Sequence, residues 1–455
     1  MLTRREDIQL KLHVVTIEDL VPADDILRKI DRIIDFSFIY AAVSDLYSAI
    51  GRPSIDPVML VKYLLLGYLE GIESERRIEQ EIQRNYAYRW FLGLDIGERV
   101  PDHSTISQNR RRRFQGQDLF RRLFEQVLFQ CMEQGLIEGK LILTDSTHIK
   151  ANASKKSELR MTVERETAWY MDDLDRYETA ERERLTGQIK PKRTHPQPQV
   201  RTEYVEKSIS ITDPEAGRLN RPGKPEGPHY LSHQSLDAKH GIIVDVAATP
   251  GNVTDGTPYL SRLAYMCEGL RLPIEAVGVD SAYDIGLVHQ TLSEQNIEIY
   301  TPPNEEKPRY KSEFTKQDFQ YDEVMDQFIC PAGCRLSIRR IQRGDCTISR
   351  EYKAKRSDCK DCSLQEKCLA PSQASRRIQV NIFEEAVRKN HEKDGTAEHK
   401  RVLDLRQIWC EGTFAAQKER HNLRRMFRRG LQAAEDHCLL SATAMNLKRM
   451  VKCLG

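Results

Sequence analysis

The chain has 455 residues, of which 39% are hydrophobic and 30% are charged, a composition typical of a soluble globular protein with about two to four structural units. Its 70 basic residues nearly balance its 68 acidic ones, so the net charge of +2 does not by itself indicate a polyanionic partner. No apolar run approaches the roughly eighteen residues of a membrane-spanning helix, and the N-terminus lacks the apolar stretch of a signal peptide. We therefore expect a cytoplasmic protein without a membrane partner.

Residues 1–138 predict a domain of short helices. Asp56 suits the N-cap of an apolar helix over residues 58–71, because proline follows it at the first helical position. A second helix is predicted over residues 74–85 and a basic one over 106–114. Short helices with tight connections resemble a helix-turn-helix arrangement, and a bundle used for dimerisation fits the pattern equally well.

Residues 139–303 mix strands with helices. The apolar run over 141–145 ends in a carboxylate and predicts a buried strand. The charged stretch 162–185 predicts a solvent-facing helix, and three prolines within 187–199 predict a linker. Further strands are predicted at 208–212, 229–236, 241–246 and 274–280, and helices at 259–269 and 286–295. This alternation predicts a mixed α/β layer architecture.

The remainder of the chain divides into two parts. Residues 304–399 are polar and rich in cysteine, with few long apolar runs, which indicates an inserted unit. Residues 400–455 predict a helix over 403–426 and an amphipathic helix over 431–453 with one apolar stripe.

Two aspartates occupy the same setting. Asp145 and Asp280 each end an apolar strand and precede a serine. Because ligands bind beyond the carboxyl ends of strands in open α/β sheets, the two carboxylates could converge and share a divalent cation. Strand-end aspartates are also common turn and N-cap residues, so the spacing alone leaves both interpretations open.

A third acid lies in a basic helical segment. Glu411 and Lys418 are two helical turns apart and project from one face. The acid would bind metal while the lysine, with the arginines that follow, binds DNA phosphates. A charged surface helix is the alternative, although Phe414 and Phe427 favour a docked one. The basic residues that we predict to contact DNA are Lys418, Arg110, Arg111, Arg112, Arg113, Arg424, Arg425, Arg428 and Arg429.

The cysteines of the inserted unit have spacings that suit zinc. Cys330 and Cys334 form a C-x3-C pair, and Cys359, Cys362 and Cys368 form C-x2-C-x5-C. Thiolates at such spacings bind tetrahedral Zn²⁺ and do not suit Mg²⁺. With Cys346 there are six candidates for four positions, and free thiols in a small irregular subdomain are the alternative. A cytosolic setting argues against disulfides.

Together these motifs resemble the DDE transposases of bacterial insertion sequences, in the branch with an N-terminal helical domain and a cysteine-rich insertion before the catalytic glutamate. The likeness runs from about residue 55 to the C-terminus, and residues 57–109 are similar to that family's helical DNA-binding or dimerisation region. The residues that carry it are Asp145, Asp280 with Ser281, Ala282, Tyr283 and Asp284, Glu411 with Phe414, Lys418, Arg425, Arg429 and Gly430, and Asn446-Leu447-Lys448.

The resemblance implies an RNase H-like core, with Asp145, Asp280 and Glu411 as catalytic ligands of Mg²⁺ or Mn²⁺. It implies cleavage and strand transfer on double-stranded DNA with terminal inverted repeats and on target DNA, by a homodimer associated with the bacterial nucleoid. Many relatives have an arginine four residues before the glutamate. Here that position is Gln407, with Arg406 beside it, which leaves the arginine's role unassigned.

Two other functions remain compatible with the sequence. One is a transposase-derived protein that binds specific DNA without catalysis. The other is a metal-dependent nuclease that cuts strands without rejoining them. Asp284 is a rival to Asp280 as the second acid, although the family pattern favours Asp280.

Overall fold

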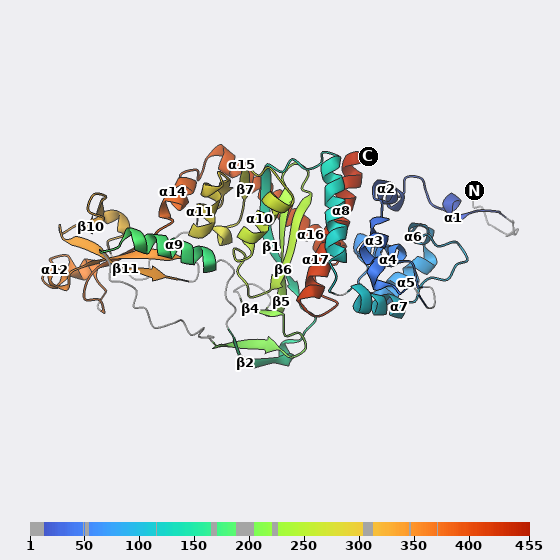
Figure 1. Cartoon of the computed structure of the whole chain (residues 1–455), viewed down its shortest axis with the longest axis horizontal. Helices are drawn as coiled ribbons and strands as arrows, with labels where there is room; N and C mark the ends of the chain where they lie inside the picture. Colours follow the sequence, from blue (N-terminus) through green and yellow to red (C-terminus); the bar gives the residue numbers. More distant parts are fainter. Residues whose placement is uncertain are drawn as a thin grey trace, which may run out of the picture.

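The computed structural model describes residues 13–48, 50, 54–114, 116–164, 171–187, 204–220, 226–303, 313–344, 347–370 and 372–455. They form an elongated molecule with three parts in a row (Figure 1): N-terminal helices at one end, a mixed sheet in the middle and an antiparallel sheet at the other end. Residues 188–199 of the linker predicted over 187–199, and Cys346, lie outside the described residues. Within the described part, no helix is both long and apolar enough to cross a membrane.

The N-terminal part is a group of short helices, as the sequence predicts. Asp56 caps α4 by accepting a hydrogen bond from the Met59 backbone N–H at 3.0 Å. The predicted basic helix begins three residues early, at His103, because Asp102 caps it through the Ser104 N–H at 2.7 Å. The helices are α1 (Ile17–Leu20), α2 (Ile26–Ile33), α3 (Phe38–Val43), α4 (Pro57–Leu69), α5 (Glu75–Arg84), α6 (Tyr86–Phe91) and α7 (His103–Asn109), followed by the π-turn η2 (Arg110–Phe114).

The central sheet has the strand order β4-β5-β1-β7-β8, with β6 paired to β5. Neighbours β1, β5 and β6 are antiparallel, whereas β1, β7 and β8 are parallel. This arrangement confirms the predicted mixed α/β architecture. The strands are β1 (Leu141–Lys150), β4 (Gly217–Leu219), β5 (Gly227–Asp237), β6 (Ile243–Pro250), β7 (Ala276–Gly278) and β8 (Glu298–Tyr300), and the connecting helices are α10 (Tyr259–Ala264) with η4 (Tyr265–Gly269), and α11 (Gly286–Glu294).

Two predictions about this region were wrong. Strand β1 continues past Asp145 to Lys150, because β5 pairs with it over its whole length. The segment expected as a solvent-facing helix begins as strand β2 (Glu158–Glu164), which pairs with β3 (Tyr204–Ser210) outside the central sheet. The helix that follows, α9 (Met171–Arg184), buries Leu174 and pairs Glu178 and Glu181 with arginines of the cysteine-bearing unit, so one of its faces packs against protein while the charged residues of the other face stay exposed.

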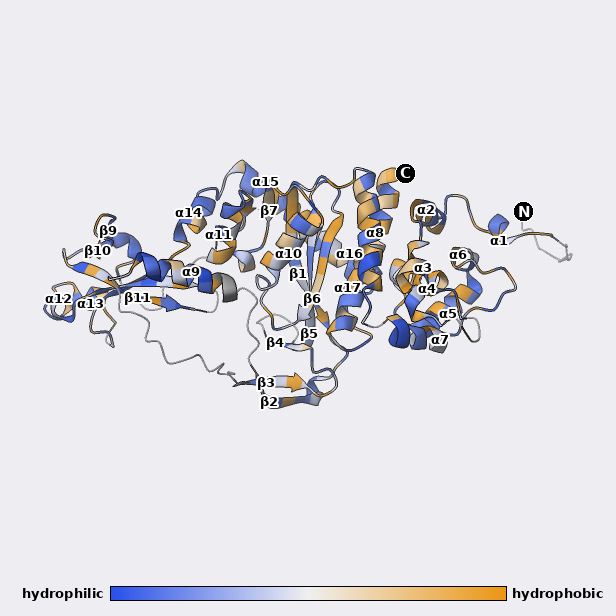
Figure 2. Cartoon of the chain, in the orientation of Figure 1, coloured by the Kyte–Doolittle hydropathy of each residue, from blue (hydrophilic) through white to orange (hydrophobic). Residues whose placement is uncertain are grey.

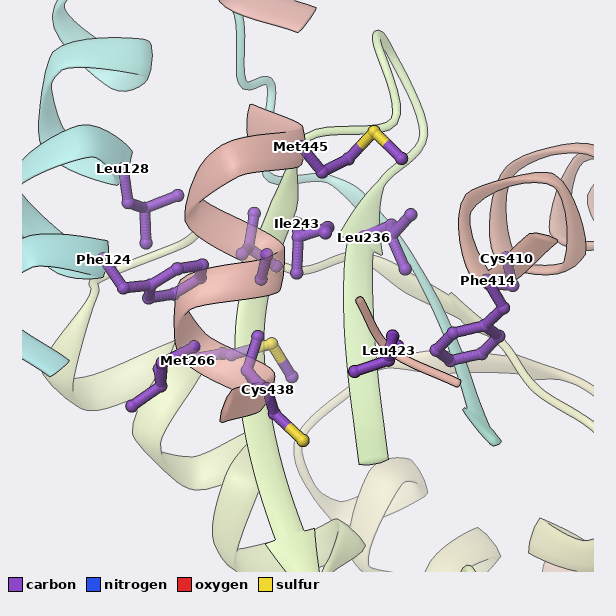
Figure 3. Close-up of a cluster of buried hydrophobic side chains, with 14 of the residues drawn as sticks. Phe124, Leu128, Leu236, Ile243, Met266, Cys410, Phe414, Leu423, Cys438 and Met445 are labelled. Carbon is purple, nitrogen blue, oxygen red and sulfur yellow. The ribbon is translucent and has the colours of Figure 1, made fainter. Parts of the chain in front are cut away.

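Two long helices cover one face of the central sheet. Helix α17 (Leu431–Leu454) lies between the sheet and α8 (Leu119–Glu133), and Figure 3 shows Phe124 and Leu128 of α8 on its outer side. Strand residue Ile243 lies on the inner side, and Cys410 and Phe414 pack beyond the sheet. The prediction of one apolar stripe on α17 was wrong. Residues 433, 434 and 436–447 are all buried, because α8, α4 and α2 cover the side turned away from the sheet.

The cysteine-bearing unit is more regular than an irregular subdomain. It is an antiparallel sheet of order β13-β12-β11-β10-β9, in which Phe328 and Tyr352 pack edge to face with ring centroids 5.0 Å apart. Figure 2 shows that this unit and α9 are mostly hydrophilic, in contrast to α8 and α17. Its elements are β9 (Gln320–Asp322), β10 (Gln327–Ile329), β11 (Arg335–Arg343), β12 (Ile348–Ala354), α12 (Arg356–Lys360), α13 (Gln365–Cys368) and β13 (Arg377–Asn381).

The chain returns to the central part through α14 (Glu384–His391), α15 (Ala397–Arg406), the π-turn η7 (Gln407–Glu411) and α16 (Gly412–Arg420). The predicted helix to residue 426 ends early, at Arg420. Asn422 has a left-handed φ of 62°, which stops the helix, and its amide donates to the Gly67 carbonyl of the N-terminal part at 3.0 Å.

Candidate active site

The two aspartates lie at the same level of neighbouring strands. Strands β1 and β7 run parallel, with Leu141 opposite Ala276 and Leu143 opposite Gly278. Asp145 and Asp280 each stand two residues further along, and parallel strands lie about 4.8 Å apart. Asp280 follows the end of β7 and accepts a hydrogen bond from the Ser281 N–H at 2.5 Å. The register therefore brings the two predicted acids together.

Helix α15 lies directly over this pair of strands. Gly278 makes the close approach possible: a Cβ at this position would stand 2.7 Å from Val402 Cγ1 and 2.9 Å from Leu143 Cδ2. The end of α15 and the following π-turn carry Arg406 and Glu411 toward β1.

Arg406 joins the strand acid to the helix acid. It donates to Asp145 Oδ2 at 2.8 Å, and its other terminal nitrogen lies 4.0 Å from Glu411 Oε1. The side chains of Arg406 and Asp145 are 13% and 17% exposed, whereas that of Glu411 is 56% exposed. A single guanidinium thus compensates a recessed carboxylate and one that opens to solvent.

The π-turn explains why Arg406 takes this position and Gln407 does not. A π-turn holds about one residue more than an α-helical turn, so residues five apart share a face where an α-helix would align residues four apart. Arg406 is five residues before Glu411 and lies beside it, and Gln407 is exposed. The arginine beside Glu411 is therefore Arg406, one position before the one that the family spacing indicates.

The electrostatic environment of Asp145 favours a cation. Burial raises the pKa of its carboxyl to about 6. The Arg406 guanidinium and the Ser146 N–H oppose this, and the carboxylates of Asp280 and Asp255 add to it. Carboxylates that share a recessed site repel one another, and a bound cation relieves that repulsion.

Asp255 was missed by the sequence-based prediction. It lies in the loop between β6 and α10, is 8% exposed, and accepts a hydrogen bond from Ser146 Oγ at 2.7 Å. The surrounding Thr254-Asp255-Gly256 sequence is typical of a turn, so no pattern distinguished this acid from a surface residue.

Lys418 reaches the same strand as Asp145. Its ammonium donates to Thr147 Oγ1 at 2.6 Å, and Thr147 is on the same face of β1 as Asp145 because side chains alternate along a strand. Glu411 and Lys418 were expected to share one helical face, and both lie on the side turned toward β1.

Two of the arginines predicted to contact DNA are engaged inside the protein. Arg110 is only 8% exposed and pairs with Glu75 at 3.0 Å, and Arg428 pairs at 2.9 Å with Asp436, whose side chain is 3% exposed. Both compensate recessed carboxylates within the protein, and the prediction that they bind phosphate stays a prediction. The arginines with exposed side chains are Arg111, Arg112, Arg424, Arg425 and Arg429, and Arg113 stacks on Tyr47.

Asp284 is committed elsewhere. Its Oδ1 lies 2.7 Å from His289 Nε2 and 3.1 Å from His391 Nε2, so it links α11 to α14. Among the described residues, this trio is compact enough to hold an ion, as are Glu79, Asp102 and His103. Asp145, Asp280 and Glu411 stand further apart, with Arg406 between two of them.

The cysteines predicted to bind zinc gather at one place. Cys330, Cys334, Cys359, Cys362 and Cys368 line a single pocket at the far end of the molecule from the N-terminal helices. All five are free thiols.

Two family models match the chain. Residues 15–112 match a transposase domain, DUF772, and residues 329–451 match a transposase DDE domain. Both models describe transposases, and the second describes a DDE domain, which confirms the resemblance to DDE-type transposases of insertion sequences seen in the sequence. A comparison with curated proteins returns no match.

Solved structures similar to the chain include three Mos1 complexes. They are the Mos1 mariner paired-end complex with Mn, the Mos1 strand transfer complex, and the Mos1 transposase paired-end complex with left transposon end. Their sequence identities are 11%, 12% and 11%, and their TM-scores are 0.17, 0.17 and 0.16. Each match covers 56% of this chain and 61%, 60% and 61% of the other, so the chain spans about three fifths of these proteins. The family assignment therefore rests on the two family models.

Proposed function

We propose that the chain binds the terminal inverted repeats of an insertion sequence, cuts DNA strands there and joins them to target DNA. The observation that carries this proposal is the placement of Asp145 and Asp280 at one level of two parallel strands, with Arg406 joining Asp145 to Glu411. The family match to a transposase DDE domain supports the same chemistry.

Asp145, Asp280 and Glu411 would hold Mg²⁺ or Mn²⁺. Carboxylate oxygens are the ligands these ions prefer, and the burial that raises the pKa of Asp145 to about 6 is a cost that a nearby cation reduces. Ions bound there would activate a water or a 3′ hydroxyl and stabilise the leaving 3′ oxygen. Arg406 balances the charge of two of the acids, and Lys418 is positioned to take a phosphate of the strand being cut.

A mixed sheet covered by helices, with two aspartates on neighbouring strands and a glutamate on a helix, supports an RNase H-like core. In this interpretation residues 139–303 and 400–455 form the core, and residues 304–399, which include the antiparallel sheet, are the insertion. The N-terminal helices of residues 1–138 would bind DNA or a second subunit.

Exposed arginines at the end of β1, the strand that carries Asp145, support a DNA path. The loop after α16 runs next to the end of β1, where Met426 N–H donates to the Lys150 carbonyl at 2.8 Å. Arg424 and Arg425 of this loop are exposed and lie close to the strand that carries Asp145. The insertion sequence has two ends, and a homodimer would place the DNA path of one subunit at each end.

The test is cleavage and strand transfer with DNA that carries the element ends, in Mg²⁺ and in Mn²⁺. Asp145→Asn, Asp280→Asn and Glu411→Gln should each reduce both reactions at least about a hundredfold, because each removes a metal ligand worth several kcal/mol. Glu419→Gln is the matched control, since Glu419 is an exposed acid on α16. Full cleavage by any of the three variants would refute the assignment.

The same assay separates the two alternatives. Specific DNA binding without cleavage in either metal would favour a binding protein that has lost catalysis. Nicked products without joined products would favour a nuclease.

A further inference from the structure

Five thiols from three separate pieces of chain meet in one pocket. Cys330 and Cys334 flank the turn between β10 and β11, Cys359 and Cys362 lie on and just after α12, and Cys368 ends α13. The rest of the lining includes Phe314, Leu336, Leu364 and Leu369. The convergence of thiols from distant positions in apolar surroundings indicates that they share one function.

The helices that carry Cys359 and Cys368 are poorly anchored. Neither α12 nor α13 contains a fully buried side chain, so hydrophobic burial fixes them only weakly against the sheet. A small unit without its own core is commonly held by a disulfide or a metal ion. All five thiols are free, which favours the metal.

Cys368 is the meeting point of the three segments. Burial raises the pKa of its thiol, and the neighbouring thiols of Cys359, Cys330 and Cys362 raise it further, while Arg376 opposes them. In the pocket that all five cysteines line, Cys368 therefore has thiols of the turn and of the α12 segment as neighbours, and Cys334 is near the thiols of Cys330 and Cys362.

Cys334 contributes its backbone. Its N–H donates to Cys330 Sγ at 3.2 Å. The turn that aims this N–H depends on Gly333, whose φ is +79°. Because the donor is a backbone group, any side chain at position 334 would preserve it.

We propose that Cys330, Cys359, Cys362 and Cys368 bind one Zn²⁺ and that Cys334 is not a ligand. Four thiolates around one centre suit tetrahedral zinc and exclude Mg²⁺. No three of these described thiols lie within 4.8 Å of one another, so the ion would draw α12 and α13 toward the turn. This site would be structural, since it has no open ligand position, and it is separate from the proposed DNA chemistry.

The first experiment measures zinc in the purified full-length chain by elemental mass spectrometry. We expect about one zinc per chain, as for a closed four-ligand site. Cys368→Ser and Cys359→Ser should lose most of it, whereas the matched control Cys334→Ser should retain it. Equal loss in Cys334→Ser and Cys368→Ser would overturn the choice of ligands, and absence of zinc from the wild-type chain purified from zinc-replete cells would overturn the site.

A second measurement covers the case in which a serine variant fails to fold. The wild-type chain is stripped of metal and titrated with Co²⁺, whose spectrum reports both geometry and sulfur ligation. Intense tetrahedral bands with thiolate charge transfer that saturate at about one equivalent are expected. Weak octahedral bands, or loss of free thiols in pairs after denaturation without reductant, would overturn the proposal. Neither readout depends on DNA cleavage, so its failure is distinct from failure of the proposed function.

Discussion

Arg406 is the residue whose positive charge compensates two of the candidate acids. It contacts Asp145 at 2.8 Å and lies 4.0 Å from Glu411, and its own Nε is buried without a hydrogen-bond partner. Removing one partner of a recessed ion pair leaves an uncompensated charge, which costs more than the pair contributes. Arg406 therefore acts on the candidate site through the carboxylates that it holds.

The variant Arg406→Gln should lower the unfolding free energy of the chain in chelator by about 2–3 kcal/mol near neutral pH. This is less than the cost of breaking a fully buried ion pair, because the pair is partly exposed. Added Mg²⁺ should restore part of the loss, because the cation takes over the compensation. Gln407→Ala is the control, since Gln407 is exposed, and should stay within about 0.5 kcal/mol of the wild type. Urea denaturation with and without Mg²⁺ measures both. An Arg406→Gln variant as stable as the wild type in chelator would contradict this role.

The sequence led to Asp145, Asp280, Glu411 and Lys418 because each stands in a conspicuous pattern, and the structure brings them to one region. The sequence left Arg406 without an assigned role and missed Asp255, for different reasons. A π-turn shifts the helical face by about one residue, and nothing in the local sequence marks that shift. Asp255 belongs to a turn whose composition is ordinary. Their roles in catalysis, like those of the predicted acids, are still predictions.

At the scale of elements, the contact between α15 and the β1–β7 pair sets the position of Glu411. Gly278 is the residue that allows the contact, since an added Cβ would meet Val402 Cγ1 at 2.7 Å. The packing of this helix is therefore coupled to the geometry of the acids at either side of it.

The variant Gly278→Ala should destabilise the chain by about 1–3 kcal/mol, the usual cost of overpacking. Val402→Ala alone should cost about 2 kcal/mol by leaving a cavity. The double variant should lose less than the sum, because the shortened side chain at position 402 makes room for the new methyl group. Gly412→Ala is the control, with nothing within 4 Å of its added Cβ. Urea denaturation gives the four values, and strict additivity would contradict the contact.

Element types were easier to predict than their surroundings. Helix α4 and strands β5 and β6 follow from local caps and apolar runs. The burial of α9 and of α17 does not, because it depends on partners far along the chain: Arg343 and Arg350 for the first, α8 and α4 for the second. A charged helix and a helix with polar positions both look solvent-facing until those partners are placed.

At the scale of the whole molecule, the N-terminal helices dock on the C-terminal segment through buried histidines. His437 Nε2 lies 2.8 Å from the Asn422 carbonyl, its Nδ1 accepts from Tyr68 Oη at 2.8 Å, and His421 Nδ1 donates to the Tyr68 carbonyl at 2.7 Å. Each histidine is 2–3% exposed. Helix α4, which carries Tyr68, is thereby tied to the segment that follows the candidate glutamate.

Both histidines are held neutral. Burial lowers the pKa of His437 to about 3, with Arg110 and Arg428 acting in the same direction. Burial lowers the pKa of His421 to about 4, assisted by Lys448, Arg420 and Arg449. In the unfolded chain both would titrate near about 6.5. Below that pH the unfolded state binds protons that the folded state does not bind. The contribution of these histidines to the free energy of unfolding is therefore complete above about pH 6.5 and declines as the pH falls.

Each histidine should therefore steepen the loss of unfolding free energy by about 1.4 kcal/mol per pH unit between about pH 6 and pH 5. Replacing one of them, as in His437→Gln, lowers stability near neutral pH but should make the slope shallower by that amount, because one group no longer titrates. His13→Gln, at an exposed position, should leave the slope unchanged. Urea denaturation across this range measures the slopes. A His437→Gln slope equal to that of the wild type would show that this histidine accepts a proton in the folded chain, and that the docking of the N-terminal helices does not depend on its neutral form.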